Sequence, residues 1–226
     1  MLKPKLPTKI GSKFSVVKAH TMQLRFSKLV IQEDILPKNI RCVAGIDVAY
    51  VYGYSIGAAV VLDYESCSVI ESKKARVKTR FPYIPTLLSF REIPPTLASI
   101  GKLKTQPDVF LVDGQGIAHP YRLGFASHLG LVLDKPTIGV AKSLLCGQVE
   151  PFTQEGQALI IDKGEVVGAA VSREREKPIY VSVGHKVSLK RVIEIVKHCT
   201  RNYRIPEPIR AAHAVADREK RRLMRT

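Results

Sequence analysis

The hydrophobic positions follow two patterns, and the first covers residues 41–78. Three apolar runs are separated there by turn residues, and the third run alternates between polar and apolar positions. Runs of this length with turn signals at both ends predict consecutive strands joined as hairpins, because the side chains of a strand alternate between its two faces. We expect strands at 41–50, 54–64 and 66–78.

From residue 86 onward, strand and helix patterns alternate. Short apolar runs predict strands at 108–112, 136–141, 156–162, 165–172 and 178–184. Helical spacing of apolar residues predicts helices at 15–34, 86–104, 119–133, 188–200 and about 206–225. Pro94 and Pro95 must start, kink or interrupt the second of these helices, because proline has no backbone N–H to donate.

No linker, repeat or low-complexity block divides the chain. Antiparallel strands followed by strands that alternate with helices predict an α/β fold, with a mixed central sheet flanked by helices. We expect one domain over residues 15–226, preceded by a basic lead-in at residues 1–14.

Composition adds a strong positive charge to this picture. The 226 residues include 36 Lys and Arg against 20 Asp and Glu, a formal net charge of +16. This balance favours a polyanionic partner, although an ordinary solvated surface also has it. The four cysteines lack C-x-x-C spacing, which favours core thiols over a zinc site. Without a membrane-length apolar run or a secretory pattern, we expect a soluble, cytoplasmic monomer.

Acidic residues occur where buried strands are predicted. Asp47 lies inside an apolar run, and its small same-face neighbours Gly45 and Ala49 would leave room beside its carboxylate. Asp113 ends another run, and sites in open α/β sheets lie beyond the carboxyl ends of strands. With Glu92, these residues could hold Mg²⁺, which prefers oxygen ligands. Hydrogen-bonded, lysine-paired or simply solvated carboxylates remain alternatives.

Three further residues could act beside such a site. On the last predicted helix, His213 points with the small apolar face toward the protein, either as a core histidine or at the metal edge. Lys142 follows the strand 136–141 and could stabilise phosphate charge or cap a turn. His119 precedes a predicted helix and could contact a phosphate or cap the helix locally.

One segment presents an aromatic residue between prolines. Tyr83 lies between Pro82 and Pro85, which stiffen the backbone. A rigid, exposed aromatic side chain can wedge into a base stack, whereas a buried one would only pack under the loop. Farther along, Gly114 and Gly116 allow a tight turn and close backbone approach.

In combination, these segments resemble the endonuclease V family of DNA repair nucleases. The resemblance is carried by AGIDVAY, PYIPTLLSFRE, LVDGQGIAHPYRLGFASHLG, PTIGVAKS, KPIYVSVGHKVSL and YRIPEPIRAAH, in that order. Six ordered motifs are far more specific than any one of them, and together they extend over most of the chain.

The resemblance implies an RNase H-like fold and Mg²⁺-dependent cleavage of DNA at deoxyinosine, at the second linkage on the 3′ side of the lesion, with Mn²⁺ able to substitute. It implies Asp47, Glu92 and Asp113 as metal ligands, with Lys142 and His213 in the active site. The residues that it places against single- or double-stranded inosine-containing DNA are Pro82, Tyr83 as the wedge, Ile84, Thr86, Leu88, Gly114, Gln115, Gly116 and His119.

Besides the run SRERE and a valine in VSVGH, two positions depart from the family pattern. Thr86 stands where the family usually has glycine, and Tyr121 stands where a basic residue is common. A side chain at position 86 can crowd the deaminated base or change which backbone N–H reaches it. We therefore expect altered base selectivity and DNA contacts, with hydrolysis retained.

Other functions stay open at this point. A different RNase H-like nuclease, including one that cuts inosine-containing RNA, would use the same carboxylates. A non-catalytic protein that binds damaged DNA is disfavoured by Asp47, Glu92, Asp113 and Lys142 together. A structural RNA-binding protein would account only for the charge, and would lose no function on Asp113→Ala.

Overall fold

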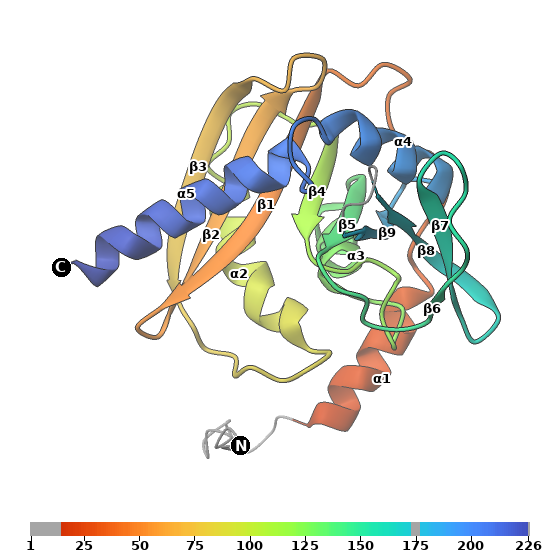
Figure 1. Ribbon diagram of the computed structural model, residues 1–226. Coiled ribbons are helices and arrows are strands. Elements are labelled where there is room, and N and C mark those ends of the chain that lie inside the picture. The colour runs from red at the N-terminus through yellow and green to blue at the C-terminus, as the bar shows by residue number, and fades with distance from the viewer. Residues whose placement is uncertain (1–14, 173–176, 226) are drawn as a thin grey trace.

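The computed structural model describes residues 15–172 and 177–225, so the predicted lead-in lies outside it (Figure 1). One nine-stranded sheet has the order β3-β2-β1-β4-β5-β9-β8-β7-β6. Its strands are β1 (Cys42–Val51), β2 (Tyr54–Asp63), β3 (Val69–Lys78), β4 (Val109–Asp113), β5 (Thr137–Ala141), β6 (Gln148–Val149), β7 (Gln157–Asp162), β8 (Glu165–Val171) and β9 (Ile179–His185). The helices are α1 (Val16–Ser27), α2 (Leu88–Ile100), α3 (Phe125–Leu133), α4 (Leu189–Cys199) and α5 (Glu207–Met224). None of these helices is both long and apolar enough to span a bilayer.

The sheet is mixed, as the sequence predicts. Strands β1, β4 and β5 run parallel, and every other neighbouring pair of strands is antiparallel. Helices cover both faces of its centre, which explains why the central strands are apolar at nearly every position. The predicted α/β fold with a mixed central sheet flanked by helices is confirmed.

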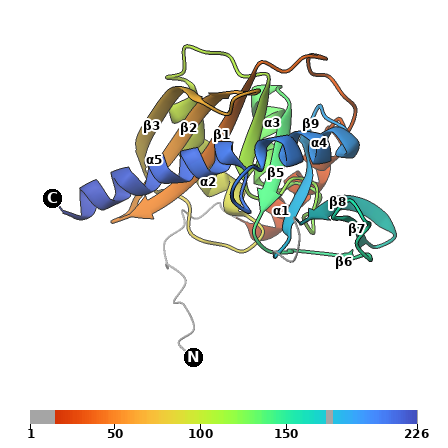
Figure 2. The same ribbon diagram turned by 45° about the horizontal axis from the view of Figure 1, so that its top comes forward.

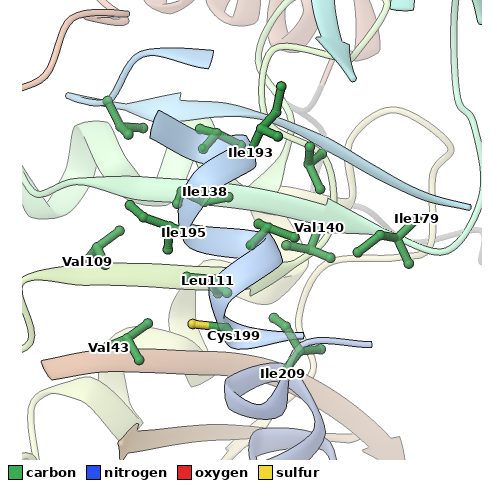
Figure 3. Packing of buried hydrophobic residues seen from close by; sticks show 14 of the residues in the cluster. Val43, Val109, Leu111, Ile138, Val140, Ile179, Ile193, Ile195, Cys199 and Ile209 are labelled. Atoms are coloured by element: carbon green, nitrogen blue, oxygen red, sulfur yellow. The ribbon is translucent and has the colours of Figure 1, made fainter. Parts of the chain in front are cut away.

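Alternate side chains of the central strands enter two separate cores. On β4, Val109 and Leu111 pack with residues of α4 and α5, as Figure 3 shows. Phe110 and Val112 point to the opposite face and pack with α3, where Leu129 is fully buried. Because the two faces are filled independently, the end of β4 is held in place from both sides.

Helix α5 lies across β1, β2 and β3 (Figure 2). Glycine at position 45 makes this close approach possible, because a Cβ on Gly45 would lie 1.7 Å from the carbonyl oxygen of Pro208. Farther along α5, the fully buried Ala212 and Ala216 keep the helix close to the sheet. Small residues therefore set the position of α5 over β1.

Two predicted helices were too long. Helix α1 ends at Ser27, and α3 begins only at Phe125. The preceding segment 119–124 is a partly buried loop, which carries apolar residues without being helical. Pro94 and Pro95 lie inside α2 and do not end it, because packing against β2 and β3 outweighs the lost N–H groups. The two-residue β6 is too short to leave a sequence pattern.

Glu219 ties α5 to β3, and this contact predicts a pH-dependent stability. Its buried carboxylate accepts hydrogen bonds from Arg222 and Lys74, which lower its pKa to about 2. An acid with a depressed folded-state pKa stabilises the protein above its unfolded pKa of about 4.3, and this stabilisation is lost as the pH falls toward the folded value. Glu219→Gln should therefore lower the free energy of unfolding at pH 7, by an amount that shrinks below about pH 4.3. Urea unfolding of both proteins from pH 7 to pH 3 measures the difference, and a constant difference would contradict the assignment.

Candidate active site

A fork between two strands brings two of the predicted carboxylates together. The parallel pairing of β1 with β4 runs from Val43 and Val109 to Ile46 and Val112. Asp47 and Asp113 are the next residue on each strand. β1 continues from there beside β2 alone, and Figure 1 shows the arrowheads of β1 and β4 diverging. The fork therefore places both carboxylates where the two strands separate. Asp113 ends its strand, as predicted, whereas Asp47 lies inside β1, which continues to Val51.

Glu92 reaches the same place from α2. Its side chain is only 7% exposed, and Oε1 accepts a 3.2 Å hydrogen bond from the Tyr50 hydroxyl. Burial raises the pKa of Glu92 to about 8; the negative charges of Asp47 and Asp113 act in the same direction. The Tyr50 hydrogen bond opposes this rise. A solvated helix residue, the alternative drawn from sequence, does not fit this environment.

Lys142 contacts the second carboxylate of the fork. It follows β5, and its Nζ lies 2.6 Å from Asp113 Oδ2. Burial raises the pKa of Asp113, Asp47 adds to the rise, and the hydrogen bond from Lys142 opposes it. Lys142 itself is half exposed, so its ammonium group is open to an anion arriving at the fork.

His213 contacts the first carboxylate from α5. Its Nδ1 lies 2.8 Å from Asp47 Oδ2, although the histidine side chain is 61% exposed. His213 thus faces the body of the protein, as predicted. The alternative of a buried core histidine is wrong, because the side chain is largely exposed. The imidazole ring lies at the edge of the face of α5 that packs on the sheet. The neighbouring Ala212 is fully buried at the centre of that face.

The residues at the fork suit a divalent cation by charge and by donor type. Within residues 15–172 and 177–225, Glu92 Oε2 is buried and has no hydrogen-bond partner. Buried carboxylate oxygens without partners are costly unless a cation or proton compensates them. In the part of the chain that the structure describes, no group of three His, Cys, Asp or Glu side chains is arranged so that it could hold a metal ion. Tyr50, Lys142 and His213 instead contact one carboxylate each.

The proline-flanked aromatic stands out from the surface. Tyr83 is 66% exposed, which excludes a tyrosine packed under its own loop. A hydrogen bond from the Leu87 N–H to the Ile84 carbonyl closes a turn beside it, and Phe81 stacks on Phe90 at 5.6 Å. Leu88 then begins α2. The loop therefore presents Tyr83 from a braced backbone, five residues before the first residue of the helix that carries Glu92.

The glycine turn after Asp113 is held by bonds within the protein. Gly114 N–H donates to the Val140 carbonyl, and Gly116 N–H donates to Ser182 Oγ at 2.9 Å. A Cβ on Gly116 would lie 2.0 Å from the Val183 carbonyl oxygen, so this position admits only glycine. Gln115 Nε2 reaches the Ser143 carbonyl. The turn is consequently a fixed wall beside Asp113.

His119 occupies a different environment from the one predicted. It does not stand at a helix N-terminus, because α3 begins six residues later. Burial lowers the pKa of His119 to about 4, so the ring is neutral near pH 7. Its Nδ1 accepts a hydrogen bond from the Tyr121 N–H, and its ring also interacts with the Thr86 backbone. His119 therefore lies between its own loop and the loop that carries Thr86, away from a helix end.

Two residues of α1 contact the loops that carry Thr86 and Leu123, and neither is among the site residues predicted from the sequence. His20 hydrogen-bonds Thr86, and the fully buried Gln23 hydrogen-bonds Thr86 and Leu123. The contacts join positions 63 to 100 residues apart, so no local pattern could reveal them. The only sequence feature that could have indicated these contacts was a glutamine within a weakly amphipathic helix.

Comparisons with known proteins identify the family of this chain. A family model described as Endonuclease V matches residues 24–214. The Endonuclease V of Thermofilum pendens is 48% identical over 210 residues, which cover 92% of this chain and 90% of the relative. The crystal structure of Endonuclease V from Streptomyces avermitilis superposes with a TM-score of 0.88 at 35% identity, covering 97% of this chain and 98% of that one.

A further similar structure contains nucleic acid. It is Ciona intestinalis Endonuclease V in complex with a 24mer DNA containing an inosine followed by a ribo-adenosine, and its TM-score is 0.81 at 32% identity. The alignment covers 92% of this chain and 98% of that one. The family model spans the strand fork, the proline-flanked loop and the first part of α5. On the family match and on the relatives' identity and coverage, the chain belongs to the endonuclease V family.

Proposed function

We propose that this nuclease recognises deoxyinosine in DNA and hydrolyses the second phosphodiester bond on its 3′ side, as a DNA repair enzyme. The main support is the strand fork, which gathers Asp47, Glu92 and Asp113 and leaves one buried oxygen of Glu92 without a hydrogen-bond partner among the described residues. The inosine-containing DNA in the Ciona intestinalis complex supports the substrate.

We further propose that cleavage requires a metal ion, and we assign this ion as Mg²⁺, with Mn²⁺ as a substitute. Asp47, Glu92 and Asp113 would hold it, because Mg²⁺ prefers carboxylate oxygens together with water and phosphate oxygens. When bound, such an ion lowers the pKa of a water and neutralises charge on the leaving oxygen.

Lys142 and His213 act on either side of these carboxylates. The half-exposed Lys142 ammonium group lies 2.6 Å from Asp113, so it can donate hydrogen bonds to a phosphate at the fork and stabilise the charge that develops there. His213 Nδ1 orients the Asp47 carboxylate at 2.8 Å, and the exposed side of the ring can exchange a proton with a water or a leaving oxygen.

The loops around Tyr83 and Gly114 form the recognition side of the site. Tyr83 would enter the base stack and take the place of the flipped inosine. The N–H groups of Leu87, Gly114 and Gly116 already donate within the protein, so we assign reading of the base to the remaining backbone groups of 83–88 and 114–116. Pro82, Ile84 and Leu88 line this side, and the Gly114–Gly116 turn forms its fixed wall.

Inosine-containing RNA is a second candidate substrate. The observation that favours it is the ribo-adenosine that follows inosine in the nucleic acid bound by the Ciona intestinalis relative. A ribose next to the lesion is therefore accommodated by a protein of this fold. The two candidates differ in the sugar, whereas the carboxylates and the base would be used in the same way.

Matched substrates test the proposal. We would measure single-turnover nicking, with Mg²⁺ present, of otherwise identical DNA duplexes that contain inosine, uracil, an abasic site or no lesion, beside single-stranded RNA with and without inosine. The proposal expects the fastest cleavage on inosine-containing DNA. Fast cleavage of inosine-containing RNA alone would move the substrate to RNA, and equal cleavage of all substrates would overturn base recognition.

Tyr83→Ala should weaken the preference for damaged DNA more than it weakens binding to DNA in general. Loss of one base-stacking aromatic typically costs about 1–3 kcal/mol, or roughly five- to 150-fold in affinity. Tyr83→Phe keeps the ring and should retain most of the preference. Fluorescence anisotropy with inosine-containing and undamaged duplexes measures both. A Tyr83→Ala variant that loses affinity equally for the two duplexes would remove the wedge role.

A further inference from the structure

Thr86 has a backbone conformation that is unusual for its residue type. Its φ angle is +70°, in the left-handed region that favours glycine. A β-branched side chain is strained there, because its Cβ crowds the backbone. The residue lies between Tyr83 and Leu88, in the loop to which we assign base recognition. Such a conformation persists only when its surroundings hold it in place.

Helix α1 provides the contacts that hold Thr86. His20 Nε2 lies 2.9 Å from Thr86 Oγ1, and this hydroxyl donates in turn to the Pro85 carbonyl at 2.5 Å. Since the hydroxyl's proton is directed to Pro85, His20 Nε2–H is the donor to Thr86. Gln23 Nε2 donates to the Thr86 carbonyl at 2.8 Å. Both the side chain and the carbonyl of Thr86 are therefore bound by one face of α1.

The same face of α1 also holds the second loop of the site. Gln23 Nε2 donates to the Leu123 carbonyl at 3.1 Å, so one fully buried amide bridges the two loops. The His20 ring stacks on Tyr121, with ring centroids 4.0 Å apart and planes 14° from parallel. Helix α1 thus fixes the separation between segment 83–88 and segment 119–123.

We propose that His20 and Gln23 are positioning residues for base recognition, and that Thr86 is a specificity-determining residue held by them. The hydrogen bonds from α1 set the shape of the opening that receives the flat purine ring of hypoxanthine. Thr86 holds this left-handed backbone conformation at the cost of strain, and its hydroxyl receives the His20 bond. This inference rests on the proposed function, because it refines the site assigned there.

Two conservative variants separate this role from a general effect on folding. His20→Phe keeps an aromatic ring to stack on Tyr121 but removes the donor to Thr86. Thr86→Ala removes the acceptor. Each should lower the ratio of the inosine rate to the uracil rate by about fivefold, the effect of one hydrogen bond near 1 kcal/mol. The double variant should lose no more than either single variant, because both remove the same bond.

The control is Val17→Ala, which truncates a side chain on α1 that is 74% exposed. It should leave the ratio unchanged. Thr86→Ser keeps the hydroxyl and should retain most of the wild-type ratio. We would measure nicking rates on inosine- and uracil-containing duplexes, with the melting temperature of each variant. Unchanged ratios in His20→Phe and Thr86→Ala would overturn the proposal. Equal losses on both substrates that follow the melting temperature would also overturn it.

Binding in EDTA distinguishes failure of this inference from failure of the proposed function. If the wild-type protein binds inosine-containing duplexes preferentially but does not cut them, the catalytic proposal fails. The affinity ratio then replaces the rate ratio in the same set of variants, with the same expected fivefold loss. If the wild-type protein shows no preference for inosine in cleavage or in binding, both proposals are overturned together.

Discussion

Asp113→Asn should reduce inosine-dependent cleavage on the order of a thousandfold, while binding to inosine-containing DNA changes little. A loss of this size is typical when one preorganised electrostatic group is removed from an active site. The substitution keeps the shape of the side chain but removes a negative charge from the fork, together with the ionic partner of Lys142. Single-turnover cleavage with Mg²⁺ and anisotropy in EDTA measure the two quantities separately.

A second acidic residue provides the control for this variant. Asp134 is 77% exposed and pairs with Lys186, away from the strand fork. Asp134→Asn changes the net charge by the same amount, so any general effect of charge on DNA binding appears in both variants. Near wild-type turnover by Asp113→Asn would remove this residue from the catalytic site.

Gly45→Ala should destabilise the fold strongly, by about 3 kcal/mol or more. Overpacking a core commonly costs 1–3 kcal/mol, and the new methyl group would lie 1.7 Å from a backbone carbonyl, which no rotamer change can relieve. Either β1 or α5 must move. Since α5 carries His213, its contact with Asp47 would be disturbed as well.

Urea unfolding measures this effect, and Gly101→Ala is the matched control. Gly101 caps α2, where an added Cβ would meet its nearest neighbour, the Leu97 carbonyl oxygen, at 3.2 Å. This control should cost about 1 kcal/mol or less. If Gly45→Ala were as stable as Gly101→Ala, close contact between β1 and α5 would not be what positions His213.

Sequence patterns predicted every strand except β6, together with the acidic end of β4, because these features follow local rules. An aspartate in an apolar run is unusual, and a carboxylate at a strand end lies at a common site position. The burial of Glu92 could not be predicted this way, because it depends on α2 approaching the fork from another part of the chain. The fork itself follows from the register of β1 against β4, which no local pattern gives.

The errors in the sequence analysis have the same origin. Partly buried loop residues at 119–124 imitate the apolar spacing of a helix, so α3 was predicted to begin too early. This misplaced His119 at a helix end, whereas the structure buries it beside Thr86. The part of α1 that contacts the loops was missed because its contacts are long-range and its own pattern is weak.

The most direct test of the central claim is the position of the cut on a duplex with one inosine, mapped at nucleotide resolution with Mg²⁺ and with EDTA. The account predicts a single nick at the second linkage on the 3′ side of inosine, which EDTA abolishes and added Mg²⁺ restores. Cleavage that persists in EDTA, or nicks whose positions do not depend on the inosine, would contradict it.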